Sequence, residues 1–330
     1  MSMKLLITID TECDSAWARS NKVSTKNAMY LPRFQKLAEK FGYKPTYLTT
    51  CEMAQDDFFV DFAIDTLEKG LCEIGSHPHP WNTPPAYKLT SNDNKFHPLL
   101  VEYPENIIHD KIKFLTDFLE DKFGRKIVSH RAGKWAFNAA YAKILCRLGY
   151  KVDCSVTPLE KLPPEKRPQS EPQAPFIDYT NCPADAYFLN STDISIPGDL
   201  PLLEIPMSTM QHYGKIKTFL LSIMPGNICK NAFRMFFGRP VYWFRPHSFH
   251  KQELSIVAEC KVKQQADYIM FMLHSSEFMP GSSPTFKTEK QVERMYEDIE
   301  QVFEFLNKNN VQGTTCSEYY DLFKSQRQNS

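Results

Sequence analysis

Three features that would assign this 330-residue chain to a class are missing from its sequence. No apolar run reaches the length of about 18 residues that a membrane-spanning helix needs. The 39 basic residues are balanced by 39 acidic ones, so no net charge draws the whole chain toward nucleic acid. The first residues lead directly into a strand-like segment, without the apolar core and cleavage site of a signal peptide. We therefore expect a cytoplasmic protein that does not bind nucleic acid.

Paired cysteine motifs are also missing. The nine cysteines are scattered, and no two of them form a Cys-x-x-Cys pair. An odd and unpatterned set fits buried thiols in a reducing compartment better than a disulfide framework. The cysteines therefore indicate the same cytoplasmic location.

What the sequence does contain is a regular alternation of short apolar segments and amphipathic helix patterns. Glycine ends several of the helix patterns, at Gly42, Gly70, Gly124 and Gly149, as is common at helix C-termini. Repeated βα units form parallel sheets with right-handed crossovers, and seven or eight such units indicate a closed or nearly closed α/β barrel. The predicted strands are residues 4–10, 45–49, 71–74, 127–131, 152–156, 202–205, 241–244 and 268–273.

No linker divides the chain, so we predict a single domain over residues 1–330. Residues 158–206 hold ten of the 23 prolines, which argues against helices there and for an ordered loop packed over the barrel. We treat residues 158–240 as an insertion or variable region of this domain.

Polar side chains gather where the predicted strands end. His77 and His79 are two residues apart between prolines that keep the backbone extended, so both imidazoles face the same side. Asp10, Glu12 and Asp14 repeat this spacing after the first strand. Imidazoles and carboxylates held together suit a metal or an acid–base site at the rim of a barrel. The alternatives are a stiffened loop whose histidines only make hydrogen bonds, and a solvated acidic loop.

Four motifs follow one another in a fixed order, each at the end of a predicted strand. They are Thr-Ile-Asp-Thr-Glu at 8–12, Glu-Ile-Gly-Ser-His-Pro-His-Pro-Trp at 73–81, His-Arg-Ala-Gly-Lys-Trp at 130–135 and Leu-His-Ser-Ser-Glu at 273–277. Together they resemble the polysaccharide deacetylase family, whose members carry the NodB-homology domain. The resemblance covers nearly the whole chain. It implies a distorted (β/α)7 barrel and the metal-dependent removal of an acetyl group from a sugar.

The resemblance also implies roles for single residues. Asp10 matches the general base, Arg131 the residue that orients this base, and His274 the acid that protonates the leaving amine. Glu12 and His77 match metal ligands. The ion is expected to be divalent, with Zn²⁺ as the first choice.

The sequence departs from the family pattern at two positions. Trp81 stands where the second histidine ligand is usual, four residues after His77, so His79 is the available substitute. Thr11 separates the base from the carboxylate ligand, which usually follows it directly. Some relatives in nucleobase-ring hydrolysis share this Trp and work without a metal. The departure therefore bears on metal binding rather than on the fold.

These matches predict a metal-dependent deacetylase that acts on an N-acetylated sugar in surface-polysaccharide biosynthesis. Trp81, Trp135 and Arg245 are the candidate substrate-binding residues, because aromatic side chains at the rim of a barrel often stack on sugars. One alternative is a metal-independent hydrolase of a non-sugar amide on the same fold. Another is a non-catalytic member that binds a glycan.

One long stretch, residues 205–252, has no acidic residue at all. Basic residues alternate there with apolar runs, which suits an anionic partner: a sugar linked to a nucleotide or a lipid, or the surface of a membrane. The alternative is a pair of barrel-wall helices whose basic side chains face water. The basic residues are Lys215, Lys217, Lys230, Arg234, Arg239, Arg245 and Lys251.

Overall fold

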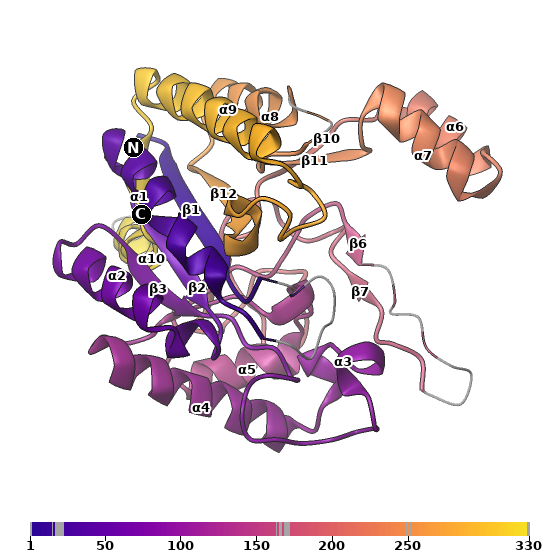
Figure 1. Ribbon diagram of the computed structural model, residues 1–330. Coiled ribbons are helices and arrows are strands. Elements are labelled where there is room, and N and C mark those ends of the chain that lie inside the picture. The colour runs from indigo at the N-terminus through magenta and orange to yellow at the C-terminus, as the bar shows by residue number, and fades with distance from the viewer. Residues whose placement is uncertain are drawn as a thin grey trace.

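The computed structural model describes residues 2–14, 16, 23–162, 164, 167, 172–248, 250 and 252–328, so Lys251 lies outside the described residues. Its centre is a curled nine-stranded sheet surrounded by helices (Figure 1). The strand order is β12-β1-β2-β3-β4-β5-β9-β8, with β13 also paired to β1, and only the β8–β9 pair is antiparallel. The predicted α/β class and distorted barrel are confirmed.

The strands of this sheet are β1 (Lys4–Thr11), β2 (Pro45–Thr49), β3 (Glu73–Ser76), β4 (Ser129–His130), β5 (Val152–Asp153), β8 (Tyr187–Phe188), β9 (Leu203–Glu204), β12 (Tyr268–His274) and β13 (Gln312–Thr314). The helices are α1 (Leu31–Lys40), α2 (Asp57–Glu68), α3 (Asp93–Phe96), α4 (Glu105–Phe123), α5 (Ala139–Arg147), α6 (Lys215–Ile223), α7 (Gly226–Phe237), α8 (Gln252–Lys263), α9 (Glu289–Lys308) and α10 (Cys316–Gln328). Short 3-10 helices are η2 (Lys26–Tyr30), η3 (Met53–Gln55), η4 (Leu100–Glu102), η5 (Gly133–Trp135) and η6 (Ser275–Phe278).

Strand β1 pairs with three other strands of the sheet. Its residues from Leu5 to Thr11 are buried, as expected for a parallel strand covered on both faces. It pairs with β12 along its length, with β13 at its start and with β2 at its end. The register places Asp10 directly beside His274. Two of the predicted functional residues are therefore neighbours by strand pairing alone.

Local signals in the sequence set the helix ends. The side chain of Asp56 accepts a hydrogen bond from the backbone N–H of Phe59 at 2.9 Å and caps α2. Asn138 caps α5 in the same way through Tyr141, also at 2.9 Å. Gly124 ends α4 with a φ of 60°, a left-handed conformation that glycine adopts at low cost. These caps fix where each helix returns the chain to the sheet.

The barrel is closed between β9 and β12 by isolated hydrogen bonds, one of them from the Met272 N–H to the Phe244 carbonyl at 3.4 Å, rather than by a strand ladder. Residues 241–244 were predicted as a barrel strand, but β11 (Val241–Trp243) forms a separate antiparallel hairpin with β10 (Thr209–Gln211). Between β9 and β12, the Ser208 hydroxyl accepts a hydrogen bond from the Met270 N–H at 2.9 Å. The Tyr268 hydroxyl donates to the Pro206 carbonyl at 2.8 Å. The β10–β11 hairpin therefore lies beside the gap between β9 and β12, next to the rim of the barrel.

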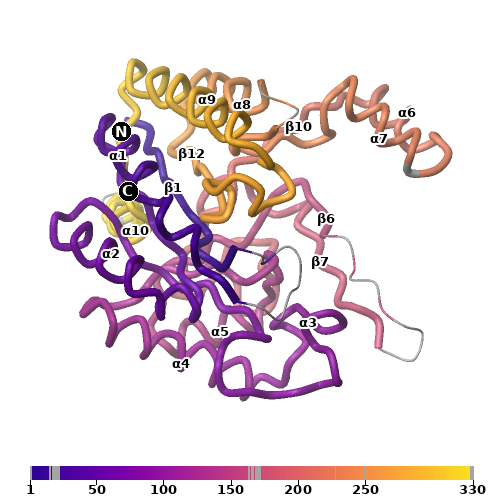
Figure 2. The backbone as a smooth tube through the Cα atoms, in the orientation of Figure 1, coloured from indigo at the N-terminus to yellow at the C-terminus, as the bar shows by residue number. Residues whose placement is uncertain are grey.

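The described part of the proline-rich region contains little regular structure. A hairpin of β6 (Lys161–Leu162) and β7 (Ile177–Asp178) extends from the barrel, and β8 adds an antiparallel edge to the sheet. Helices α6 and α7 project from the β10–β11 hairpin away from the rest of the molecule (Figures 1 and 2). In the part of the chain that the structure describes, no helix is long and apolar enough to cross a membrane.

Candidate active site

The nine predicted site residues come together at the carboxyl ends of the parallel strands. A cavity of about 410 Å³ opens there, and eight of the nine line it, with the fully buried Arg131 beneath them. In barrels of this kind the carboxyl rim carries the active site. The predicted residues that line the cavity are Asp10, Glu12, His77, His79, Trp81, Trp135, Arg245 and His274.

Asp10 is held by Arg131 at the end of β1. The Arg131 Nη1 donates to the Asp10 Oδ1 at 2.5 Å, and its Nη2 donates to the Thr8 hydroxyl at 2.9 Å. The third nitrogen, Nε, donates to the Cys154 carbonyl at 2.9 Å. Burial by itself would raise the pKa of Asp10, but the guanidinium charge and the nearby histidines outweigh it and lower the pKa to about 2. Asp10 is therefore a fixed, ionised carboxylate.

Trp135 forms the surface on which the Arg131 guanidinium rests. The guanidinium carbon lies 4.4 Å from the centre of the indole ring, the geometry of a cation–π contact. Trp135 and its neighbour Lys134 have φ values of 60° and 56°, which are rare for residues with a side chain. Such conformations cost about 1–3 kcal/mol each and persist where the surroundings enforce them. The Tyr179 hydroxyl contributes by donating to the Trp135 carbonyl at 2.6 Å.

Glu12, His77 and His79 form a compact group of possible metal ligands. One donor atom from each lies within 4.8 Å of the other two. The Glu12 Oε2 is 3.1 Å from the His79 Nε2 and 3.9 Å from the His77 Nε2. Two ligands at about 2.1 Å from a tetrahedral ion are about 3.4 Å apart. Two imidazoles and one carboxylate are also a common donor set of catalytic zinc. The residues therefore fit a divalent ion.

The histidine environments support the same interpretation. The His77 Nδ1 donates to the Arg131 carbonyl at 2.9 Å, which leaves the Nε2 lone pair facing the carboxylates. This is the usual outer partner of a metal-binding histidine. The His79 Nδ1 is buried and has no hydrogen-bond partner among the described residues. Burial lowers the pKa of both imidazoles to about 4, so both are neutral, the form that binds a metal.

His79 fits into its place because Gly133 has no side chain. A Cβ at this glycine would lie 2.4 Å from the His79 Nδ1 and 2.7 Å from the Pro78 carbonyl oxygen. On its other face, His79 stacks on Trp81 with the ring centres 4.3 Å apart. Gly133 and Trp81 together therefore hold the His79 imidazole in place.

His274 is oriented by a carboxylate that the sequence analysis did not single out. Its Nδ1 donates to the Glu277 Oε2 at 3.2 Å, and its Nε2 lies 3.7 Å from the Asp10 Oδ2. Arg245 donates to the same Glu277 oxygen at 2.7 Å. Burial lowers the pKa of His274, but the hydrogen bond to Glu277 and the nearby carboxylates outweigh it, and the net shift is upward. His274 is therefore poised to carry a proton toward the cavity.

Some candidates lie elsewhere or serve the fold. Asp14, expected beside Asp10 and Glu12, accepts hydrogen bonds from the Asn27 N–H at 2.8 Å and side chain at 2.7 Å, and it does not line the cavity. Asp153 is buried at the end of β5, with one carboxylate oxygen 2.6 Å from the His130 Nδ1. Bonding within the fold therefore accounts for these side chains.

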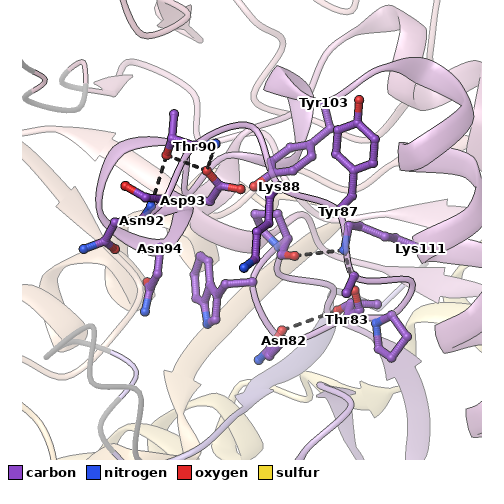
Figure 3. A pocket seen from close by; sticks show the side chains of 15 residues that line it. Asn82, Thr83, Tyr87, Lys88, Thr90, Asn92, Asp93, Asn94, Tyr103 and Lys111 are labelled. Carbon is purple, nitrogen blue, oxygen red and sulfur yellow. Dashed lines mark hydrogen bonds between the residues drawn. The ribbon is translucent and has the colours of Figure 1, made fainter. Parts of the chain in front are cut away.

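A second cavity, of about 450 Å³, lies beside the first, and Trp81 lines both. Its wall is the loop of residues 80–94, including Asn82, Tyr87 and Asn92 (Figure 3). Lys111 of α4 shapes this loop from below, because its buried ammonium donates to three backbone carbonyls of residues 80–85 at 2.5–2.9 Å. Trp81 therefore separates two neighbouring cavities and contributes to the wall of each.

No family model matches the sequence, and no curated protein matches it either. Solved structures do match. A protein from Mycobacterium smegmatis, provisionally assigned as a polysaccharide deacetylase, is 14% identical with a TM-score of 0.53, covering 99% of this chain and 92% of that one. A provisionally assigned glycoside hydrolase/deacetylase from Parabacteroides distasonis is 10% identical with a TM-score of 0.60, covering 98% and 72%.

The chain has the polysaccharide deacetylase fold. This is the fold that the four sequence motifs implied. A 4-alpha-glucanotransferase from Thermococcus litoralis is also similar, at 12% identity and a TM-score of 0.54, with 97% of this chain and 40% of that one covered. Because identities this low establish the fold alone, the activity must be argued from the residues in the cavity.

Proposed function

We propose that the protein is a deacetylase that removes an acetyl group from an N-acetylated sugar. The observation that carries the proposal is the placement of Asp10 and His274 around the Glu12–His77–His79 group. Asp10 is ionised and fixed, whereas His274 is oriented by Glu277 and has a raised pKa. Two titratable groups pushed in opposite directions within one cavity suit a base and an acid.

Glu12, His77 and His79 are the residues that would hold a divalent ion, with Zn²⁺ as the expected metal. When bound, such an ion supplies Lewis acidity that polarises an acyl oxygen and makes water more acidic. The neutral imidazoles and the bond from the His77 Nδ1 to the Arg131 carbonyl support this assignment. The carboxylate of Glu12 would offset part of the ion's charge.

The proposed reaction divides proton transfer between two residues. Asp10 takes a proton from the attacking water, whose oxygen bonds to the acyl carbon. His274 gives a proton to the amide nitrogen as the carbon–nitrogen bond breaks, releasing acetate and a free amine. Arg131 holds Asp10 in place throughout, because its other two nitrogens are bonded to the Thr8 hydroxyl and the Cys154 carbonyl. Acid–base catalysis of this kind typically contributes roughly 10²- to 10⁴-fold.

We propose that the substrate is a glycan of surface-polysaccharide biosynthesis, carried on a nucleotide or a lipid. Trp81 and Trp135 offer aromatic faces for a sugar ring, and the Arg245 guanidinium lies at the same wall. Because Trp81 lines both cavities, a second sugar unit fits the cavity bounded by residues 80–94. This arrangement supports an oligosaccharide rather than a single sugar.

The experiment is acetate release from oligomers of N-acetylglucosamine, with metal-stripped protein and with protein reloaded with Zn²⁺. We expect activity only after reloading. We also expect that the Glu12→Gln and His79→Ala variants bind Zn²⁺ more weakly, as measured by calorimetry. Lys113→Gln, on the exposed face of α4, is the matched control. Activity that persists in stripped protein would mean that the reaction needs no metal, and a lack of activity in both forms, with turnover of a non-sugar amide, would favour the metal-independent hydrolase. Binding without turnover would favour the glycan-binding alternative.

A further inference from the structure

The α6–α7 arm, residues 215–237, exposes large apolar side chains that the barrel does not cover. No described side chain of either helix is buried. Single exposed apolar residues are ordinary, but a contiguous set on one element marks a surface that binds something. The six most exposed, each 61–87% exposed, are Ile216, Phe219, Ile223, Ile228, Met235 and Phe236.

The charge of the arm has one sign. It carries four basic residues, Lys215, Lys217, Lys230 and Arg234, and no acidic residue. The acid-free stretch extends on both sides of the arm, from residue 205 to residue 252. A solvated surface helix usually mixes both signs, which supports its helix through pairs along one face. The arm therefore presents apolar and basic groups together, with nothing within it to neutralise them.

The arm is fixed at its base and free along its length. At the base, the His212 side chain contacts the Phe237 carbonyl at 3.0 Å, and its ring stacks on Tyr242 at 4.0 Å. Gly238 lies against Tyr242, where a Cβ would come within 2.2 Å of the hydroxyl oxygen. In the described chain, neither helix has an extended contact with another helix or strand. Both figures of the whole molecule show the arm projecting alone (Figures 1 and 2).

We propose that the α6–α7 arm docks the protein on an anionic membrane surface. Helices of 9 and 12 residues are too short to span a bilayer, which takes about 20 residues. They are suited to lie at the interface, with apolar side chains among the acyl chains and basic side chains at the lipid phosphates. The arm connects β10 to β11, and Trp243 of β11 lines the candidate active-site cavity. Docking therefore brings the cavity near the membrane.

The charge of the arm favours a membrane over a second copy of the chain. Two arms packed on each other would bring eight basic residues together, four from each chain, with no acidic partner between them. Like charges brought together oppose association, whereas phosphates of anionic lipids would neutralise these groups. Phe219, Phe236 and Phe237 also place aromatic rings in the arm, and such rings favour the interface.

Vesicle co-sedimentation of the full-length protein tests the proposal. We expect binding to vesicles of phosphatidylcholine with phosphatidylglycerol at low salt, much weaker binding at high salt, and little to phosphatidylcholine alone. Each basic residue near an anionic surface strengthens binding by roughly 5-fold. The triple variant Lys215→Gln/Lys217→Gln/Lys230→Gln should therefore bind roughly 100-fold more weakly. Lys113→Gln/Lys126→Gln, exposed lysines elsewhere, is the matched control and should bind like the unmodified protein.

A tryptophan reporter tests the apolar contribution separately. Phe236→Trp places an indole on the arm, and its emission should shift to the blue with anionic vesicles. Phe58→Trp, on the exposed side of α2, is the control and should not shift. The double variant Phe219→Ser/Phe236→Ser should weaken vesicle binding. Phe176→Ser should not, although Phe176 and Phe219 are both 63% exposed.

Equal binding by the arm variants and the controls would overturn the proposal, as would a failure of the unmodified protein to bind anionic vesicles. The oligomeric state supplies a further check by analytical ultracentrifugation. A dimer that becomes a monomer when Phe219 and Phe236 are replaced would assign the arm to self-association instead. Melting temperatures of all variants, expected to be unchanged, separate lost binding from lost folding. None of these outcomes depends on the proposed deacetylase activity.

Discussion

Around the candidate active-site cavity, Asp10 is buried against Arg131, and Glu277 against Arg245. In the α6–α7 arm, which the β10–β11 hairpin joins to the cavity wall, the basic residues have no acidic neighbour within the arm and the apolar ones are exposed. A buried charge costs several kcal/mol unless it is paired, so each cavity residue depends on its partner. An exposed residue carries no such dependence. Substitutions around the cavity should therefore change stability and turnover, whereas substitutions in the arm should change binding to a membrane surface.

The largest effect is expected for Asp10→Asn. The amide keeps the size and one hydrogen-bond acceptor for Arg131 but cannot take a proton, so turnover should fall by roughly 10²- to 10⁴-fold. Acetate release measures the loss. Lys217→Gln on the arm is the comparison, and its turnover of a soluble oligosaccharide should stay near normal. Similar activity of Asp10→Asn and the unmodified protein would show that another group is the base.

The next effect concerns stability rather than rate. Asp10→Ala leaves the Arg131 charge buried without its carboxylate, which should cost about 3–5 kcal/mol of the free energy of unfolding. Replacing both residues, Asp10→Ala with Arg131→Met, removes the unpaired charge and should recover part of this loss. Urea unfolding of the two single variants and the double variant forms a double-mutant cycle. Additive losses would mean that the pair is not coupled.

A smaller effect is expected at the shared wall of the two cavities. Trp81→Phe keeps an aromatic ring, whereas Trp81→Ala removes the face that borders both cavities and stacks on His79. For Trp81→Ala, kcat/KM should fall on the order of 10-fold, equivalent to about 1.4 kcal/mol, and more for long than for short oligosaccharides. An equal loss of kcat/KM for long and short oligosaccharides would mean that the second cavity does not bind substrate.

The residues that the sequence placed at strand ends lie together around one cavity. A strand that ends in Asp10 and one that ends in His274 must meet if both belong to a parallel sheet, and the register confirms that they are neighbours. The periodicity of side chains cannot show which polar atom bonds to which. Glu277 therefore went unrecognised as the partner of His274, and Arg245 was assigned to substrate alone although it also bonds to Glu277.

The sequence also could not predict how the barrel closes. Residues 241–244 have the apolar pattern of a barrel strand, and this pattern does not distinguish a central parallel strand from one arm of a hairpin. In the structure these residues pair with β10 as β11, and beside β12 only isolated hydrogen bonds form, to the Ser208 hydroxyl at 2.9 Å and to the Phe244 carbonyl at 3.4 Å. Hydrophobic periodicity carries no information about this choice of partner.

The smallest effect is expected where the arm is changed. Replacing Phe219 and Phe236 by Ser removes two large apolar side chains, yet both are more than 60% exposed. Little contact area is lost, so the free energy of unfolding should change by less than about 0.5 kcal/mol per site. Phe271→Ala is the matched core variant: its ring is fully buried against Phe244 and Phe303, and its loss should cost about 3–5 kcal/mol.

Urea unfolding of the three proteins measures this contrast directly. A large loss from the arm variant would mean that its apolar residues are buried in the folded protein in solution, by another copy of the chain or by the barrel itself. A small loss, together with weakened vesicle binding, would mean that these side chains stabilise no part of the fold. Exposing large apolar side chains to water is unfavourable, so side chains that do not stabilise the fold need another reason to be on the surface. Binding to a membrane after folding would bury them and supply that reason.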